Sequence, residues 1–315
     1  MSVIFLVLRI IFNYIPCLAF LQNSRFIMQD FVDNPHDRNM FLMDHKVESK
    51  VSCAGACDRD VFCLSFYYSK EEKRCLTNTF VLHPSELTQN TQGSFQYFVK
   101  EVIKRTRTCS EVKQNDPASV EGHYWLFPEA SSLYGNRVRI YCHNMTETTP
   151  LEYISLLNPN VGVFPALRNA DCTNGVVMSS GHEGTTTFYK VKVMVDSVII
   201  VTNNYDYTFA NWTGKRYPYG AAGDCYSPQS STQKGPCGPV GSFHINFDGT
   251  GLRTYGKTSW RSSNDTNISF KASSSSNIKV ICGGLCGYCY IRGPGLTLTV
   301  NREEMIDQDS AIVVV

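Results

Sequence analysis

The sequence lacks an excess of charge of either sign. Its 315 residues include 29 basic and 28 acidic side chains, which gives a formal net charge of +1. Proteins that bind DNA or RNA present an excess of Lys and Arg to the phosphate backbone. The balance excludes a broad electrostatic interface of that kind, and we expect no nucleic-acid partner.

The sequence also lacks a long hydrophobic run beyond its first twenty residues. A membrane-spanning helix needs about 20 consecutive apolar residues, and no stretch after Phe20 offers them. Residues 3–20 are apolar but are interrupted by Arg9 and Asn13, which indicates a secretory signal peptide at residues 1–19, cleaved after Ala19. A retained signal anchor is the alternative. We therefore expect a secreted, extracellular protein without a stable membrane span.

Histidines at metal-binding spacing are missing as well. A zinc protease carries H-E-x-x-H, so that two imidazoles one helical turn apart face one metal ion. His182 and Glu183 are followed by Gly184, Thr185 and Thr186, and the other six histidines are scattered. We expect no catalytic residues, no metal ion and no cofactor.

One nucleotide-binding pattern is present without its structural context. Residues 251–258 match G-x-x-x-x-G-K-T, a loop that must leave a strand and open a helix to hold phosphate. The residues that follow, 259–267, have a low propensity to form a helix. We interpret Gly249 and Gly251 as residues of a tight turn instead.

What the sequence has in abundance is cysteine. Cys17 lies in the leader, and the remaining twelve form a group of four and a group of eight. An even number in a secreted chain predicts disulfides. The last three cysteines could instead be metal ligands or a redox pair, but they follow a strand in a Gly-rich segment, which favours disulfides. The predicted disulfide cysteines are Cys53, Cys57, Cys63 and Cys75, and then Cys109, Cys142, Cys172, Cys225, Cys237, Cys282, Cys286 and Cys289, with the pairing of these eight left open.

Four N-glycosylation sequons support passage through the secretory pathway. They lie at Asn144, Asn211, Asn264 and Asn267. The last two are too close for both to be modified.

The first group of cysteines lies in a small α+β module. Residues 48–58 predict a short helix with Cys53 and Cys57 on one face, and residues 62–68 and 94–99 predict strands. Cys-x3-Cys, then Cys-x-x-Ser-Phe-x-Tyr and a fourth cysteine resemble the PAN/apple module, here over residues 26–99. The resemblance implies the pairs Cys53–Cys75 and Cys57–Cys63, and the outer third disulfide of apple domains has no counterpart.

A basic segment at residues 100–108 separates the two modules. A solvated linker is the simpler interpretation of such a short charge run. A processing site at Lys104-Arg105 or after Arg107 is the alternative.

The second module is predicted to be all-β. Alternating apolar and polar residues indicate strands, and no segment of comparable length has a helical period. Turns rich in Gly and Ser separate the strands, so we expect an antiparallel β-sandwich or related fold, and a mainly β protein overall. The clearest strands are residues 138–142, 190–195, 242–247, 278–282 and 296–300.

Several separated motifs of this module resemble the GON domain, which covers residues 109–301 and leaves a tail at 302–315. That family stands at the C-terminus of secreted zinc metalloproteases with thrombospondin repeats, whose catalytic and thrombospondin parts have no counterpart in this sequence. The resemblance implies metalloprotease lineage and no activity of its own. The motifs are residues 122–126, 138–145, 151–156, 222–227, 243–252 and 282–289.

A segment dense in aromatic residues, 205–226, is the candidate binding surface. Large rigid side chains with a polar tip often anchor partners, and we single out Trp212, Tyr217 and Tyr219. Packing within the core is the alternative explanation.

Taken as a whole, the sequence predicts a secreted, non-enzymatic protein in which PAN-like and GON modules recognise extracellular proteins or glycans. One alternative is an accessory protein of metalloprotease lineage. Another is a lectin, because residues 122–128 and 138–145 resemble the opening of fibrinogen-like domains, although the Gly-Gly-Trp segment of that family is replaced by Leu151-Glu152-Tyr153.

Overall fold

The computed structural model describes most of the chain between Arg25 and Glu304. The described residues are 25–32, 43–82, 94–101, 105–165, 175–177, 183–202, 205–223, 226–228, 240–256, 260–262, 267–272, 274–283, 288–293, 295–302 and 304. The expected signal peptide and most of the expected tail lie outside them.

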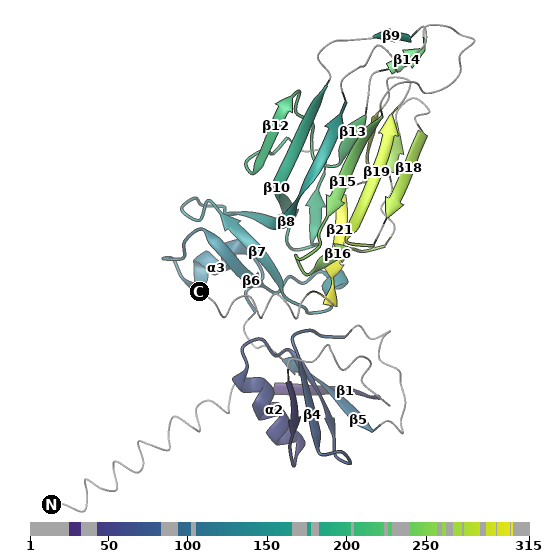
Figure 1. The fold of residues 1–315 in the computed structure, drawn as a ribbon. Coiled ribbons are helices and arrows are strands. Elements are labelled where there is room, and N and C mark those ends of the chain that lie inside the picture. Colours follow the sequence, from purple (N-terminus) through teal and green to yellow (C-terminus); the bar gives the residue numbers. More distant parts are fainter. Residues whose placement is uncertain are drawn as a thin grey trace, which may run out of the picture. The chain divides into compact units, whose positions relative to one another are not determined.

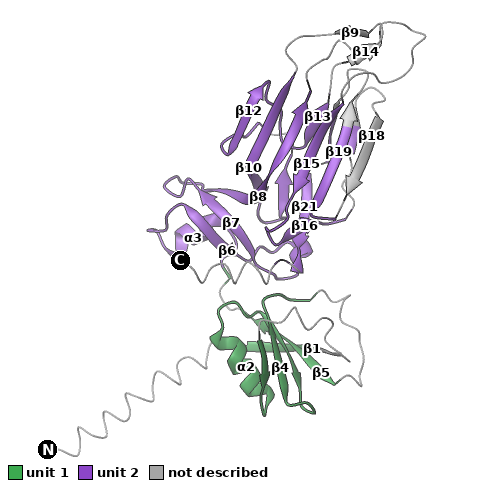
Figure 2. Ribbon diagram, viewed as in Figure 1, with its two compact units in different colours: residues 1–105 green, residues 106–315 purple. Residues whose placement is uncertain are grey.

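The chain divides into two compact units, Met1–Arg105 and Thr106–Val315, shown in Figure 2. The division falls within the segment predicted to be a linker, of which residues 102–104 lie outside the described part. Among the described residues, no helix has both the length and the apolar character needed to span a membrane.

In its described residues, unit 1 is a five-stranded antiparallel sheet with one helix packed on it (Figure 1). The helix α2 (Lys50–Arg59) begins at Ser49, whose Oγ accepts a hydrogen bond from the Ser52 amide at 3.1 Å. Such a cap satisfies one of the free N–H groups of the first turn. The strands are β1 (Arg25–Val32), β2 (Met43–Lys46), β3 (Ser65–Ser69), β4 (Arg74–Asn78) and β5 (Phe95–Glu101), in the order β1-β5-β3-β4-β2.

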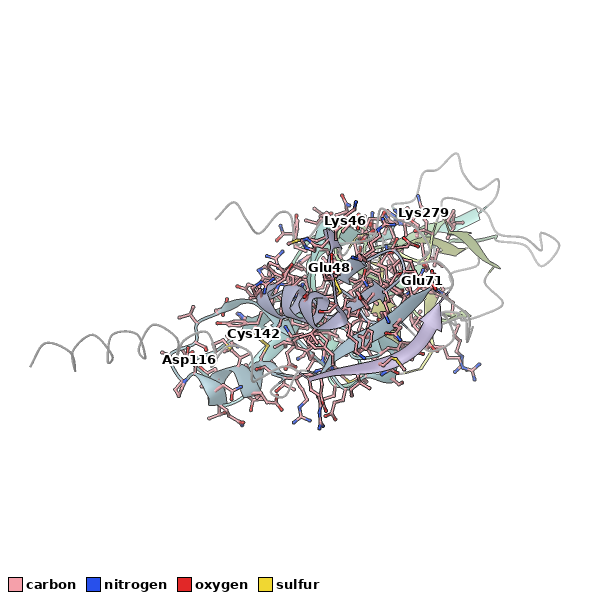
Figure 3. The ribbon with its side chains drawn as sticks, turned by 90° about the horizontal axis from the view of Figure 1, so that it is seen from below. Lys46, Glu48, Glu71, Asp116, Cys142 and Lys279 are labelled. Atoms are coloured by element: carbon pink, nitrogen blue, oxygen red, sulfur yellow. A yellow bond between two sulfur atoms is a disulfide. The ribbon has the colours of Figure 1, made fainter. Side chains whose placement is uncertain are left out.

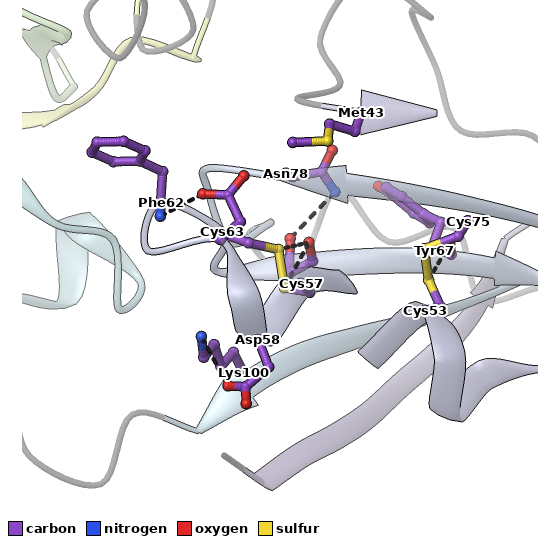
Figure 4. Close-up of a disulfide and its surroundings, with 12 residues drawn as sticks. Met43, Cys53, Cys57, Asp58, Phe62, Cys63, Tyr67, Cys75, Asn78 and Lys100 are labelled. Atoms are coloured by element: carbon purple, nitrogen blue, oxygen red, sulfur yellow. Dashed lines mark hydrogen bonds and ion pairs between the residues drawn. A yellow bond between two sulfur atoms is a disulfide. The ribbon is translucent and has the colours of Figure 1, made fainter. Parts of the chain in front are cut away.

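Two disulfides tie α2 to the chain around it (Figure 4). Cys53 is bonded to Cys75 on β4, and Cys57 is bonded to Cys63 just before β3. These are the pairs that the PAN/apple resemblance implies. All four side chains are at most 1% exposed. The helix therefore turns its sulfur atoms toward the sheet.

Strand β3 is buried on both faces. Phe66 stacks on Phe98 with ring centroids 4.8 Å apart, beside the disulfides. On the opposite face Tyr67 packs against Tyr97, also at 4.8 Å, and the Tyr97 hydroxyl accepts a hydrogen bond from the Leu82 amide. The centre of unit 1 is thus aromatic on each side of one strand.

Unit 2 is built on a large antiparallel sheet (Figure 1). The main path runs β16-β21-β11-β10-β8-β15-β19-β18, while β12 pairs with β10 and β6 pairs with β7, which pairs with β8. This confirms the mainly β prediction. The bounds are β6 (Gly122–Leu126), β7 (Val138–His143), β8 (Leu151–Phe164), β10 (Gly184–Met194), β11 (Ile199–Val201), β12 (Ala210–Gly214), β15 (Gly241–Asn246), β16 (Leu252–Thr254), β18 (Asn267–Ala272), β19 (Asn277–Gly283) and β21 (Gly295–Val300).

A smaller sheet of three strands packs on this large one through β13 (Ala221–Gly223), which contacts β8, β15 and β19. Gly162 on β8 permits the close approach, because a Cβ there would lie 2.9 Å from the Phe243 ring and 3.1 Å from the Ala221 carbonyl oxygen. Phe243 is fully buried between the layers. The other two strands are β17 (Trp260–Ser262) and β20 (Tyr288–Ile291), and β9 (Gly175–Val177) pairs with β14 (Tyr226–Pro228).

A bulge interrupts the pairing of β10 with β8. The register shifts between Phe188 and Lys190, where residues 156–159 of β8 face a single position. Phe188 points into the core before the bulge and Val191 points into it afterwards, so Tyr189 and Lys190 both lie on the outer face. Extra residues at a bulge re-aim the side chains that follow.

Unit 2 opens with a helix, α3 (Cys109–Asn115), where the sequence predicted strands only. Thr108 caps it by accepting a hydrogen bond from the Glu111 amide at 3.1 Å. Cys109 in its first turn is bonded to Cys142 on β7, a residue labelled in Figure 3 near Asp116 at the end of the helix. The Thr-x-x-Glu spacing is the signal of a capped helix start that our prediction missed.

The glycine-rich stretch at 249–251 forms a turn. Gly249 and Gly251 have φ values of +77° and +71°, which suit glycine. Both amides donate hydrogen bonds to one oxygen of the Glu304 carboxylate, at 2.9 and 3.2 Å. Strand β16 occupies positions 252–254 inside the G-x-x-x-x-G-K-T pattern, and the next described element after the pattern is strand β17, where a phosphate-binding loop would have opened a helix.

Candidate binding surface

The candidate surface lies at an edge of the large sheet. Among the described strands, β12 pairs only with β10. Residues 211–214 are all exposed. An edge strand leaves backbone donors and acceptors unpaired along one side, which makes it accessible to a partner.

Three aromatic rings and one cation gather on this edge. Tyr207 packs against Trp212 with centroids 5.7 Å apart, and Tyr205 packs against Tyr207 at 6.2 Å. The Arg216 guanidinium lies 5.2 Å from the Trp212 ring centroid and 4.7 Å from that of Tyr207. We call Tyr205, Tyr207, Trp212 and Arg216 the edge patch. Such cation–π contacts hold an exposed ring in one orientation.

Trp212, Tyr205 and Arg216 are the accessible members of the edge patch. Trp212 is 45% exposed and Tyr205 is 73% exposed. Tyr207 lies beneath them, and burial raises the pKa of its hydroxyl, an effect that the nearby charge of Arg216 opposes. The structure thus places the predicted Trp212 at the surface, next to residues that our prediction did not single out.

Tyr217 is only half-buried and packs against the sheet. Its ring stacks on Phe164 at 3.3 Å, and its amide donates a hydrogen bond to Thr186 Oγ1 at 3.0 Å. Burial, together with the negative charge of Glu183, raises the pKa of Tyr217 to about 12. One face of the Tyr217 ring is therefore covered by Phe164.

Tyr219 was wrongly assigned to the binding surface. It is 2% exposed and packs edge-on against Phe188 and Phe243 at 5.2 and 5.1 Å. Its hydroxyl accepts a hydrogen bond from Asn160 Nδ2 at 2.8 Å. After β12 the chain crosses to β13 on the inner face of the sheet, which carries Tyr219 into the core.

The structure describes only some of the remaining cysteines that were predicted to form disulfides. Cys289 on β20 is fully buried and disulfide-bonded. Cys282 is the second-last residue of β19, but its side chain lies outside the described part. Cys172, Cys225, Cys237 and Cys286 lie outside the described residues.

The sequons differ in their surroundings. Asn211 is exposed on β12, and its Nδ2 lies 3.5 Å from the Tyr189 hydroxyl. Asn144 is half-buried in a turn with a φ of +56°, and its amide donates a hydrogen bond to Glu121 at 3.0 Å. Asn267 begins β18, and Asn264 lies outside the described residues.

A second polar and aromatic cluster, which our prediction missed, lies on β7, β8 and the segment 206–209 before β12. His143 and Tyr153 both contact Phe209, at 5.0 and 4.9 Å, and the Tyr153 hydroxyl donates a hydrogen bond to Asp206 at 2.7 Å. Burial and the Asp206 carboxylate raise the pKa of Tyr153. The alternation of Tyr141 and His143 along β7 is the sequence signal that could have revealed it.

Catalytic metal ligation has no support in the described part of the chain, where no group of three or more His, Cys, Asp or Glu side chains could hold a metal ion. The edge patch presents exposed rings, a cation and an open strand edge.

The chain is similar to a defined part of proteins that are named for a metalloproteinase and thrombospondin motifs. The family described as the GON domain matches residues 106–300. These residues include 122–128 and 138–145, which suggested the lectin alternative. No solved structure matches the chain.

Curated relatives extend this similarity. The chain is 31% identical over 214 residues to "A disintegrin and metalloproteinase with thrombospondin motifs gon-1" of Caenorhabditis elegans, which covers 62% of this chain and 9% of that protein. It is 26% identical over 239 residues to "A disintegrin and metalloproteinase with thrombospondin motifs 20" of Homo sapiens, covering 70% of this chain and 12% of the relative. The chain thus spans about a tenth of the length of these relatives. Since the family match covers well over half of its residues, the chain belongs to the GON-domain family.

Proposed function

We propose that this protein is a secreted, non-enzymatic recognition protein of the extracellular space, with the edge patch of unit 2 as its contact surface. The observation that carries this proposal is the exposure of Trp212 on an edge strand, held by Arg216 and Tyr207. Aromatic and Arg side chains in such surroundings often dominate binding energy. Extracellular proteins or glycans are the partners that fit it.

Several observations support a role without catalysis. The GON region is a non-catalytic part of the proteases that carry it. The sequence has no H-E-x-x-H segment, and a zinc protease cannot assemble its metal site without an equivalent ligand set. We therefore propose that the similarity to metalloproteases reflects shared lineage.

Unit 1 is proposed to be a PAN/apple-like module that acts as a second recognition element. In support, α2 packs on a five-stranded sheet and carries the disulfides Cys53–Cys75 and Cys57–Cys63. The family match begins only at residue 106, so this assignment depends on the fold and the cysteine spacing.

The test measures binding of the full secreted chain to a glycan array and to a panel of purified matrix glycoproteins. We expect at least one ligand whose binding falls about tenfold or more in Trp212→Ala, the loss typical of a dominant interface residue. Tyr255→Ala is the matched control, since Tyr255 is an equally exposed aromatic residue, at 49%, outside the edge patch. Equal binding by both variants would remove the edge patch from the proposal.

An accessory role beside a metalloprotease is the second candidate, favoured by the names of the relatives. It predicts that the purified chain contains no stoichiometric zinc and cleaves no peptide alone. It further predicts that the chain changes the rate of a metalloprotease that is added to it. Peptidase activity of the isolated chain, together with bound zinc, would contradict both candidates.

A further inference from the structure

Four strands of unit 2 bring a second set of polar side chains to one outer face. The sheet register pairs His123 of β6 with Tyr141 of β7, and Ser155 of β8 with Lys190 of β10. Arg139 lies two residues before Tyr141 on the same side of β7. We call His123, Arg139, Tyr141, Ser155 and Lys190 the basic face.

The basic face is open but ordered by its own contacts. The His123 ring lies 5.1 Å from that of Tyr141, and its Nε2 shares a hydrogen bond of 2.9 Å with the Ser155 hydroxyl. The Lys190 ammonium stands 4.5 Å from the Tyr141 ring centroid and 5.1 Å from that of Phe209. The register shift between β8 and β10 is what turns Lys190 outward.

The two full cations of this face have no carboxylate partner in the part of the chain that the structure describes. Within the described residues, no ion pair involves Arg139 or Lys190. The nearby Glu121 already accepts hydrogen bonds from the Tyr141 hydroxyl and the Asn144 amide and pairs with His143. A second carboxylate, that of Asp206, accepts hydrogen bonds from the Tyr153 and Thr208 hydroxyls and forms an ion pair with Lys192.

The pKa of His123 responds first to burial and then to the two cations. Burial, followed by the positive charges of Arg139 and Lys190, lowers the pKa of His123 to about 4. The ring is therefore neutral at pH 7, and a third positive charge is disfavoured there. An anion placed among these groups would oppose both cations and favour the protonated ring.

We propose that the basic face binds an acidic polysaccharide, with a sulfate or carboxylate group between Arg139 and Lys190 and a sugar ring beside His123 and Tyr141. Charge-assisted hydrogen bonds from Arg and Lys supply affinity for the anion. The half-exposed aromatic ring and the Ser155 hydroxyl match the apolar faces and hydroxyl groups of a sugar. A shallow face across four strands suits a linear polymer better than a small molecule, which needs a concave pocket.

This inference shares with the proposed function only the extracellular location that would supply the polymer. Its residues are separate from those of the edge patch. Trp212→Ala is therefore expected to leave binding at the basic face unchanged, and failure of either proposal can be distinguished from failure of the other.

The test uses the full chain and a sulfated octasaccharide of the heparin type, with its desulfated form and inorganic sulfate as comparisons. Because a hydrogen bond to a charged group is worth more than a tenfold change in affinity, we expect Lys190→Gln and Arg139→Gln each to weaken octasaccharide binding about tenfold. Lys70→Gln, which removes an exposed cation of unit 1, is the charge-matched control and should change it less than about twofold. Thermal unfolding of each variant checks that the fold is retained.

Protonation gives an independent measurement. Because bound anion raises the pKa of His123 above its free value of about 4, binding takes up a proton, so affinity should rise as the pH falls toward 4. NMR titration of the His123 ring should show this pKa shift on saturation with the octasaccharide, and His123→Gln should lose most of the pH dependence. Four results would each overturn the proposal. Lys190→Gln and Lys70→Gln could weaken binding equally, or the desulfated form could bind as well as the sulfated one. The pKa of His123 could stay unchanged on binding, or the octasaccharide could bind no more tightly than inorganic sulfate (an adventitious ion only).

Discussion

The two units stabilise their interiors by different means. In unit 1 the disulfides themselves occupy the core, since Cys53, Cys57, Cys63 and Cys75 lie between α2 and the sheet at no more than 1% exposure. In unit 2 the centre is filled by aromatic side chains, and the Cys109–Cys142 bond joins α3 to β7. Small domains bury too little apolar area to offset chain entropy and depend on crosslinks. Among the described residues, the disulfides therefore form part of the core of the smaller unit, whereas packed aromatic rings fill the core of the larger one.

The largest effect is expected from a variant that removes a packed aromatic ring from the core of unit 2. Phe243→Ala should lower the free energy of unfolding of unit 2 by about 3–5 kcal/mol, because it deletes a fully buried ring between two layers. Hydrogen exchange followed by mass spectrometry measures each unit separately, and peptides from residues 43–82 should be unaffected. Val240→Ala, at a position 43% exposed, is the control. A loss below about 1 kcal/mol would show that the layer around Gly162 is not a tightly packed core.

The converse test removes a crosslink from unit 1. Replacing Cys53 and Cys75 together by Ala should destabilise unit 1 by about 2–4 kcal/mol, since the open chain gains entropy in the unfolded state. Protection of peptides in unit 2 should stay the same. If exchange in unit 1 did not change, its aromatic pairs around β3 would be sufficient without the disulfide.

A smaller effect is expected from one buried hydrogen bond of unit 2. Tyr219→Phe keeps the ring but leaves Asn160 Nδ2 without its acceptor, which should cost about 1–3 kcal/mol. The same measurement on Tyr124→Phe, whose exposed hydroxyl donates to the Val120 carbonyl, should show less than about 0.5 kcal/mol, as is usual for surface changes. Equal effects would indicate that water replaces the lost acceptor at Asn160.

The smallest expected effect concerns the start of unit 2. Thr108→Ala removes the cap of α3 and should cost about 1 kcal/mol. Thr108→Ser keeps the hydroxyl and should retain most of that energy. Local exchange of the amides in residues 109–115 reports the change, and an equal loss in both variants would assign it to the methyl group of Thr108.

Several features could be predicted from the sequence because they depend on local pattern. Helix α2 follows from two cysteines four residues apart, and β7, β15 and β19 follow from plain alternation. Strand β10 was predicted only from Lys190 onward, although it begins at Gly184. The bulge reverses which residues face the core, so one alternating pattern could not describe both halves.

The candidate site was harder to predict, because density of aromatic residues does not distinguish surface from core. Trp212 and Tyr219 are seven residues apart in the same aromatic segment, yet one is exposed and the other buried. Whether each side chain is exposed or buried depends on where the chain crosses from β12 to β13, which is a property of the tertiary fold. The contact of Lys190 with Tyr141 likewise joins residues from strands that are 49 positions apart in the sequence.

The register shift between β8 and β10 has a consequence for the lengths of related chains. Tyr189 and Lys190 face outward together between the inward Phe188 and Val191, so β10 holds one residue more than plain alternation needs. Loss of Tyr189 would restore alternation and leave Lys190 outward and Val191 in the core. Homologous chains should therefore tolerate a gap of one residue at this point, provided that an apolar residue remains on each side of it.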